Sequence, residues 1–78
     1  MIDLKKVLTD IVKVIVDFPD EVSVTGKNRG DAVYLTLHVA EDDMGKVIGR
    51  HGKIARSLRL VMKAAASTIG KSVSVEIK

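Results

Sequence analysis

Apolar residues near the start of the chain recur at the spacing of a helix. The spacing is i, i+4, i+7 and i+11, and its members are Leu4, Leu8, Ile11 and Ile15. Asp3 can act as the N-cap residue, and Pro19 ends the element because the residue before a proline avoids the helical region. The pattern predicts an amphipathic helix over about residues 3–17 that packs its apolar face against the core.

Three later stretches alternate apolar and polar residues, which is typical of half-buried β-strands. The first two, 22–25 and 33–39, are separated by the polar segment 26–31, whose glycines and Asp31 predict a turn. The third stretch, 73–77, lies at the C-terminus. We expect a hairpin and a third strand, forming a sheet with one buried face and one face in water.

Two helices are predicted between the second and third strands. Asp42 or Asp43 can cap a short helix that runs through Ile48 and stops at Gly49. A longer helix follows Gly52, and its apolar stripe consists of Ala55, Leu58, Met62, Ala65 and Ile69. Its C-terminus is expected at the glycine of position 70, in the C′ position.

The order of elements is therefore helix, strand, strand, helix, tight turn, helix, strand. This order predicts an α+β fold in which the helices pack on one face of a three-stranded sheet. The whole chain, residues 1–78, is expected to form one domain, with no linker or repeat.

The composition excludes several classes of protein. The chain has no cysteine, so disulfides, thiolate catalysis and cysteine-based zinc sites are excluded. Charged residues interrupt the apolar residues of the N-terminus, and no run approaches the roughly 20 apolar residues of a membrane span. We therefore expect a soluble, cytoplasmic protein with no membrane partner.

Enzymatic activity is not expected either. His38 and His51 are the only histidines, and neither has a second histidine or a cysteine at the spacing of a metal site. No serine or threonine lies in the setting of a nucleophile. The chain is therefore interpreted as a non-catalytic protein without a metal, a cofactor or a small-molecule substrate.

Basic residues are concentrated in the second half of the chain. The net charge is +3, and no acidic residue lies between Asp43 and Glu76. The cations of this segment are Lys46, Arg50, Lys53, Arg56, Arg59, Lys63 and Lys71. Such segregation indicates a basic face that attracts anionic partners, although a solvated helix face would give the same pattern.

The most specific local signal is a Gly-x-x-Gly turn, Gly49 to Gly52, inside this basic segment. Glycine accepts positive φ and has no side chain, so a polyanion backbone can approach such a turn closely. A helix that begins after the turn would direct free N–H groups and its positive dipole end at a phosphate. Nucleic-acid binding is therefore the leading functional hypothesis.

The turn and its surroundings resemble a known family. The segment Val47-Ile48-Gly49-Arg50-His51-Gly52, within a strand–helix–helix–strand unit, is similar to the signature of a KH domain. The helix and strand that precede this unit match the type II arrangement, α-β-β-α-α-β. Over its whole length the chain resembles the small bacterial single-KH-domain RNA-binding proteins of the KhpA (YlqC-like) family, including the break at Pro19 and the stretch 55–59.

This resemblance implies a function and partners. It implies binding of about four nucleotides of single-stranded RNA over the turn. It also implies a homodimer, or a heterodimer with a second KH protein of the KhpB (Jag-like) type, and roles in RNA regulation or chaperoning and in cell-envelope and cell-shape homeostasis. Two alternatives stay open: a protein-interaction module with an idle KH groove, and a binder of single-stranded DNA.

Several charged residues are candidate RNA contacts. Arg50 and His51 at the tip of the turn would contact phosphates, and His51 would do so more strongly when protonated at lower pH. Lys46 and Lys53 flank the turn and would add salt-sensitive attraction. Arg56 is a further candidate, although for Arg56, Arg59 and Lys63 the pattern slightly favours a solvated helix face over direct contact.

Apolar residues beside the turn could form a floor for the bases. The candidates are Ile48 and Ile54, with Leu35 or Leu37 from the neighbouring strand, and a plain core role fits each of them as well. The aromatic residues Phe18 and Tyr34 both lie outside the basic segment. The sequence therefore predicts no aromatic stacking platform, and recognition through phosphates, van der Waals contacts and base edges.

Overall fold

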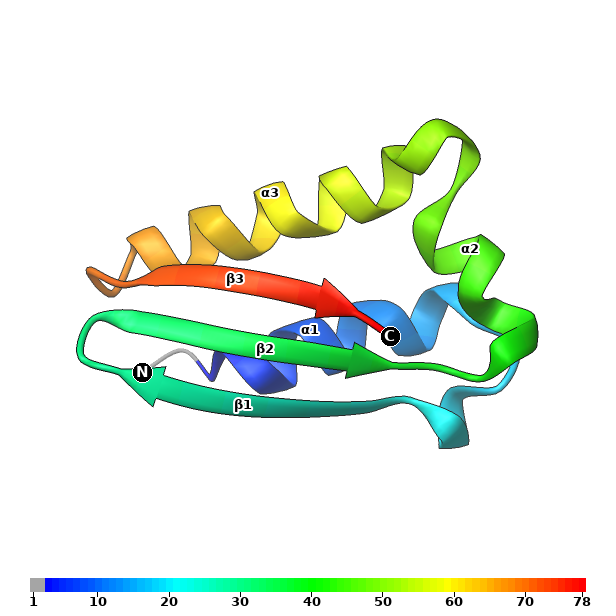
Figure 1. The fold of residues 1–78 in the computed structure, drawn as a ribbon, viewed down its shortest axis with the longest axis horizontal. Coiled ribbons are helices and arrows are strands. Elements are labelled where there is room, and N and C mark those ends of the chain that lie inside the picture. Colours follow the sequence, from blue (N-terminus) through cyan, green and yellow to red (C-terminus); the bar gives the residue numbers. More distant parts are fainter. Residues whose placement is uncertain (1–2) are drawn as a thin grey trace.

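The structure, a computed structural model, describes residues 3–78. Figure 1 shows its helices and strands in the order α1, β1, β2, α2, α3 and β3. Their bounds are α1 Leu4–Ile15, β1 Ser23–Arg29, β2 Ala32–His38, α2 Met44–Ile48, α3 Lys53–Ser67 and β3 Ser72–Ile77. Three short 3₁₀ turns, at Pro19–Glu21, Glu41–Asp43 and Arg50–Gly52, connect them.

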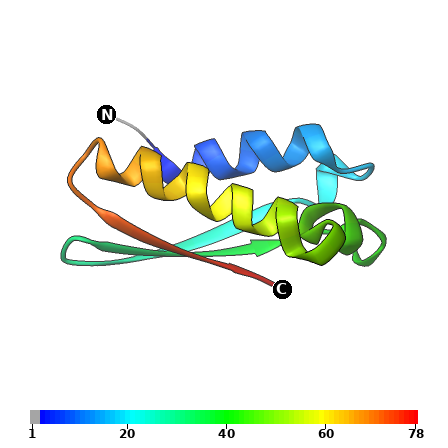
Figure 2. The same ribbon diagram turned by 90° about the horizontal axis from the view of Figure 1, so that it is seen from above.

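The strands form one three-stranded sheet in the order β1-β2-β3. β1 pairs antiparallel with β2, and β2 pairs parallel with β3, so that β2 lies in the centre. The helices cover one face of this sheet, and within the described chain no helix covers the other face (Figure 2). The predicted α+β architecture and its element order are confirmed.

The core lies between the sheet and the helices. Alternate residues of β2 point into it, and Leu37 is fully buried there, as are Leu8 of α1 and Met62 of α3. The remaining buried apolar residues of the core cluster are Leu4, Val12, Val16, Val24, Val33, Leu35, Val47, Leu58, Ala66 and Val75. Two helical stripes and one alternating strand thus meet in one apolar layer, as their periodicity predicts.

Two predicted helix ends, the start of α1 and the end of α3, are confirmed by hydrogen bonds, whereas α1 ends at Ile15 and not at about residue 17. The Asp3 carboxylate accepts a hydrogen bond from the Lys6 backbone N–H at 3.2 Å and caps α1. After α3, Gly70 takes a φ of 69°, and the N–H of Lys71 donates to the Ala66 carbonyl at 3.0 Å. This is the Schellman arrangement that a glycine at C′ permits.

The prediction of a polar loop over residues 26–31 is wrong. β1 continues to Arg29, because residues 26–29 pair with β2 in register, and only Gly30 and Asp31 lie between the two strands. Gly30 supplies the positive φ of 60° that so short a connection needs. Cross-strand pairing thus overrides the turn-like composition of this segment.

Asp43 has a different role from the predicted helix cap. It precedes α2, but its fully buried carboxylate gives that helix no side-chain cap. Its two oxygens instead accept hydrogen bonds, each of 3.0 Å, from the backbone N–H groups of Asp17 and Phe18. The carboxylate therefore ties the chain that leaves α1 to the start of α2 and satisfies two backbone donors that follow a helix end.

Candidate nucleic-acid interface

The Gly-x-x-Gly turn joins α2 to α3 at one end of the molecule (Figure 1). Gly49 adopts φ 76° and ψ 173°, a combination that is practically restricted to glycine. A Cβ atom at this position would lie 2.6 Å from Cγ1 of Ile54. Backbone conformation and packing both therefore require glycine at position 49.

The two residues at the tip of the turn adopt the left-handed helical backbone conformation. His51 takes φ 57° and ψ 24°, and Gly52 takes φ 73° and ψ 17°. For a residue with a Cβ atom this conformation costs roughly 1–2 kcal/mol. Residues held in such conformations are concentrated at ligand-binding sites, and His51 is exposed.

α3 begins at Lys53, directly after the turn, and its N-cap is Gly52, which gives no side-chain cap. The N–H of Lys53 already donates to the Arg50 carbonyl, but the positive dipole end of α3 is available to an anion. Arg50, His51 and Lys53 are exposed beside this helix start, and Arg56 is exposed one helical turn further on. The structure therefore brings four of the predicted basic contacts together at one end of α3.

Lys46 differs from these four because its ammonium group already has a partner. On α2, one turn before Gly49, it forms an ion pair with the carboxylate of Asp17. The hydrogen bond to Asp17 raises the pKa of Lys46 above its ordinary value. Sequence reasoning missed Asp17, since nothing in the sequence links two residues that lie 29 positions apart.

The apolar candidates separate into two groups. Ile48 and Ile54, on either side of the turn, are 39% and 36% exposed, so each presents apolar surface next to the cations. Leu35 and Leu37 are 3% and 0% exposed and belong to the core. Of the proposed floor for the bases, only the two isoleucines are therefore accessible.

Arg59 faces the edge strand of the sheet. Its Nε donates a hydrogen bond of 3.1 Å to the backbone oxygen of Val75 in β3. The side chain thus connects α3 to the sheet as well as adding charge, and both Arg59 and Lys63 are exposed.

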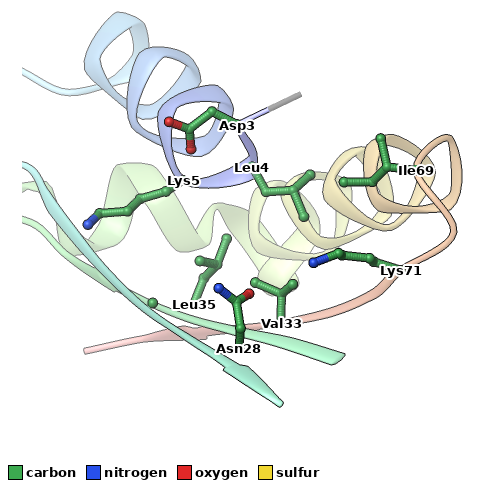
Figure 3. A pocket seen from close by; sticks show the side chains of 9 residues that line it. Asp3, Leu4, Lys5, Asn28, Val33, Leu35, Ile69 and Lys71 are labelled. Atoms are coloured by element: carbon green, nitrogen blue, oxygen red, sulfur yellow. The ribbon is translucent and has the colours of Figure 1, made fainter. Parts of the chain in front are cut away.

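A hollow of about 530 Å³ lies away from the turn, beside the N-terminus of α1 (Figure 3). Its apolar side chains come from α1, β2 and the segment after α3, and Lys5 and Lys71 stand on its walls. This end of the molecule is opposite the Gly-x-x-Gly turn along the long axis (Figures 1 and 2). Of the predicted RNA contacts, only the core residue Leu35 lines it, and none of the predicted cationic contacts does.

Two further observations concern residues 3–78. They contain no group of three histidine or acidic side chains arranged to hold a metal ion. None of their helices combines the length and the apolar character needed to cross a membrane.

Two helices joined by a Gly-x-x-Gly turn and packed on a three-stranded sheet, in the chain order α-β-β-α-α-β, define a KH domain. The same fold occurs in a crystal structure of an Era variant from Aquifex aeolicus bound to GDP.AlF4-, with a TM-score of 0.70 over 95% of this chain and 29% of that one. At 15% identity this likeness shows the fold alone.

The sequence then identifies the family. Residues 5–77 match the family model of the KhpA/KhpB KH domain, and the chain belongs to this family. It is 49% identical to the RNA-binding protein KhpA of Clostridium acetobutylicum, over 95% of this chain and 99% of that protein. It is 43% identical to the RNA-binding protein KhpA of Streptomyces coelicolor, over 95% of this chain and 90% of that protein. The family is non-catalytic, in agreement with the expectation from the sequence.

Proposed function

We propose that the chain binds single-stranded RNA, about four nucleotides of it, over the Gly49–Gly52 turn. The observation that carries this proposal is the turn itself, whose glycine-specific conformation presents Arg50 and His51 to solvent at the uncapped start of α3. The relatives named as RNA-binding proteins KhpA favour RNA as the ligand.

Each residue around the turn has a distinct part in the proposed binding. Gly49 and Gly52 leave room for the sugar-phosphate backbone, and Arg50 and His51 contact its phosphates. Lys53 and Arg56 extend this attraction along α3. Three further residues belong to the proposed binding site: the apolar residues Ile48 and Ile54, and Lys46, which is paired with Asp17.

The apolar pair offers van der Waals contact to the bases. The ammonium group of Lys46 is already paired with the Asp17 carboxylate, so a phosphate must compete with that carboxylate and the contribution of Lys46 is reduced. Affinity of one domain is therefore expected to depend mainly on the cations that have no such partner.

The proposal is tested by fluorescence anisotropy of a short unstructured RNA with wild type and with Arg50→Asp/His51→Asp. We expect loss of binding in the variant and a steep salt dependence in wild type. Lys5→Asp is the control, because this exposed position lies in the first turn of α1, where an acid is tolerated. Circular dichroism checks that all three proteins fold.

Equal binding by the loop variant and wild type would contradict the proposed site. Wild type that binds no RNA would favour the second candidate, a protein-interaction module with an idle groove. Single-stranded DNA of the same sequence, titrated in parallel, distinguishes an RNA-specific groove from one that accepts both RNA and DNA.

We also propose that the chain acts as a homodimer or pairs with a KhpB-like KH protein. Val14 of α1 and Leu60 and Val61 of α3 are large apolar residues that are 86%, 69% and 48% exposed. Their burial against a partner would remove this apolar surface from water. Light scattering, which reports molecular mass, of wild type, Val61→Glu and the control Lys63→Glu tests self-association. A monomeric wild type would contradict it.

The cellular roles belong to the same proposal. RNA chaperoning would appear as faster annealing of complementary strands in the presence of the protein, and the loop variant would lose it. A role in cell-envelope and cell-shape homeostasis would appear as altered cell dimensions when the loop variant replaces wild type.

A further inference from the structure

The helices leave one face of the sheet uncovered (Figure 2). By strand alternation, this face carries a row of mostly polar and charged side chains. Alternation along each strand decides which residues point outward, since Val24, Leu35 and Val75 are buried on the helical side. The outward positions are Ser23, Thr25, Lys27 and Arg29 of β1, Ala32, Tyr34, Thr36 and His38 of β2, and Ser72, Ser74 and Glu76 of β3.

Tyr34 occupies the middle of this face. It lies on the central strand, 47% exposed, with Lys27 directly opposite on β1 and Ser74 directly opposite on β3. Tyr34 lines a hollow of about 200 Å³ together with Thr25, Gly26, Lys27 and Thr36. About half of the Tyr34 side chain is therefore accessible to a ligand, and its cross-strand neighbours are a lysine and a serine.

The charges around Tyr34 favour an anionic ligand. Lys27 is its direct cross-strand neighbour, and Arg29 is the next outward residue along β1. Neither forms an ion pair with another residue of 3–78. The acid of this face, Glu76, lies 3.6 Å from the ammonium of Lys78.

We propose that this face is a second RNA contact, in which a base stacks on Tyr34 and the adjoining phosphates contact Lys27 and Arg29. Every base has a π-face, so such stacking tolerates any sequence, and lysine and arginine beside the ring hold the backbone. The proposal rests on RNA as the ligand of this chain, but it places the contact on the opposite side of the sheet from α3.

A nucleic acid fits this face better than a protein does. The centres of protein interfaces are depleted in lysine, and here a lysine is the direct cross-strand neighbour of the aromatic ring. The face has hydroxyl and cationic side chains around the ring, and its described residues include no exposed aliphatic cluster. Stacking plus phosphate contact is the recognition mode that this composition supports.

The basic segment gives no sign of such a platform, because Tyr34 lies outside it. The β1–β2 register supplies the cations instead, from a strand whose second half was predicted to be a loop. Two separate contacts on one small domain would let a longer RNA bind more tightly than either contact alone, since the second contact is intramolecular.

The chain provides its own reporter for this contact. Tyr34 is the only tyrosine, and the chain has no tryptophan, so its ultraviolet emission comes from this ring. Titration of wild type with an oligouridylate of about ten nucleotides is expected to quench this emission, in parallel with the anisotropy change of the labelled oligonucleotide.

Two substitutions at the ring separate stacking from other effects. Tyr34→Phe keeps the π-face and is expected to bind as wild type. Tyr34→Thr keeps β-propensity but removes the ring, and affinity is expected to fall roughly 5- to 160-fold, the equivalent of about 1–3 kcal/mol for one stacked base.

The cations are tested with a charge-matched pair. Lys27→Gln/Arg29→Gln is expected to weaken binding and to flatten its salt dependence. Lys5→Gln/Lys13→Gln removes the same charge from exposed positions of α1, and is expected to change binding much less. Equal effects of the two double variants would overturn the proposed phosphate contacts, because they would show that only net charge matters.

The outcome at the ring is independent of the outcome at the turn. Quenching that persists in Arg50→Asp/His51→Asp supports the second contact even if the turn proves idle. An unquenched ring at saturating RNA, or equal affinity of Tyr34→Thr and wild type, overturns the second contact and leaves the turn proposal standing. The face would then be open to a protein partner.

Discussion

Substitution of Asp43 tests how the start of α2 is connected to the segment that follows α1. Its carboxylate is fully buried and accepts two backbone hydrogen bonds, from Asp17 and Phe18, both at 3.0 Å. Asp43→Asn keeps the size and shape of the side chain. It leaves one oxygen to accept and puts an NH₂ group opposite a backbone N–H, so two donors face each other.

The expected loss follows from these contacts. A hydrogen bond to a charged group contributes about 1.5–3 kcal/mol, and an unsatisfied buried group costs about 1–3 kcal/mol. The neutral amide is easier to bury than the carboxylate, which offsets part of this. We expect the free energy of unfolding to fall by about 3 kcal/mol, out of about 4–12 kcal/mol for a domain of 78 residues.

Urea unfolding followed by circular dichroism measures this loss. With an m-value of about 1 kcal/mol per molar urea, the midpoint should fall by about 3 M. Asp42→Asn is the matched control, because the neighbouring carboxylate is exposed, and it should change the midpoint little. If the two variants unfolded at the same urea concentration, the two hydrogen bonds would not have the stabilising role that their geometry indicates.

The remaining predictions concern the turn and its nearest ion pair. Gly49→Ala should lower the free energy of unfolding by about 2–3 kcal/mol and Gly52→Ala by only about 1 kcal/mol, because the added methyl group meets an isoleucine side chain at the first position and open space at the second. A larger loss of thermal stability at Gly52 would contradict this. Asp17→Asn should free Lys46, raise RNA affinity and steepen the salt dependence by about 0.7 in slope. Asp10→Asn breaks a comparable exposed ion pair on α1, so an equal gain there would refute the explanation.

Much of the fold could be predicted from periodicity. The stripe of α1, the alternation of β2 and the cap residues at both helix ends all repeat a local rule that neighbouring residues obey. The error at residues 26–29 has the same origin, because glycine and asparagine favour turns locally, while pairing with β2 determines the strand. Local preference decides only where no partner strand competes with it.

The candidate site, like the fold, could be predicted only in part from the sequence. The turn and its cations are contiguous in the sequence, so Gly49, Arg50, His51 and Gly52 could be named together. The pairing of Lys46 with Asp17 could not, since the two residues meet only through the packing of α1 against α2. For the same reason, the exposed ring of Tyr34 beside cations of another strand appears only in the folded sheet.

By itself, the sequence determined the order of elements, the glycine turn and the segregation of charge, because each depends on residues within a few positions of one another. The tertiary structure alone decided which charges are paired, which apolar residues are accessible and what the buried Asp43 carboxylate binds. Those properties depend on contacts between segments distant in the chain, and a pattern of residue types along one dimension does not specify such contacts.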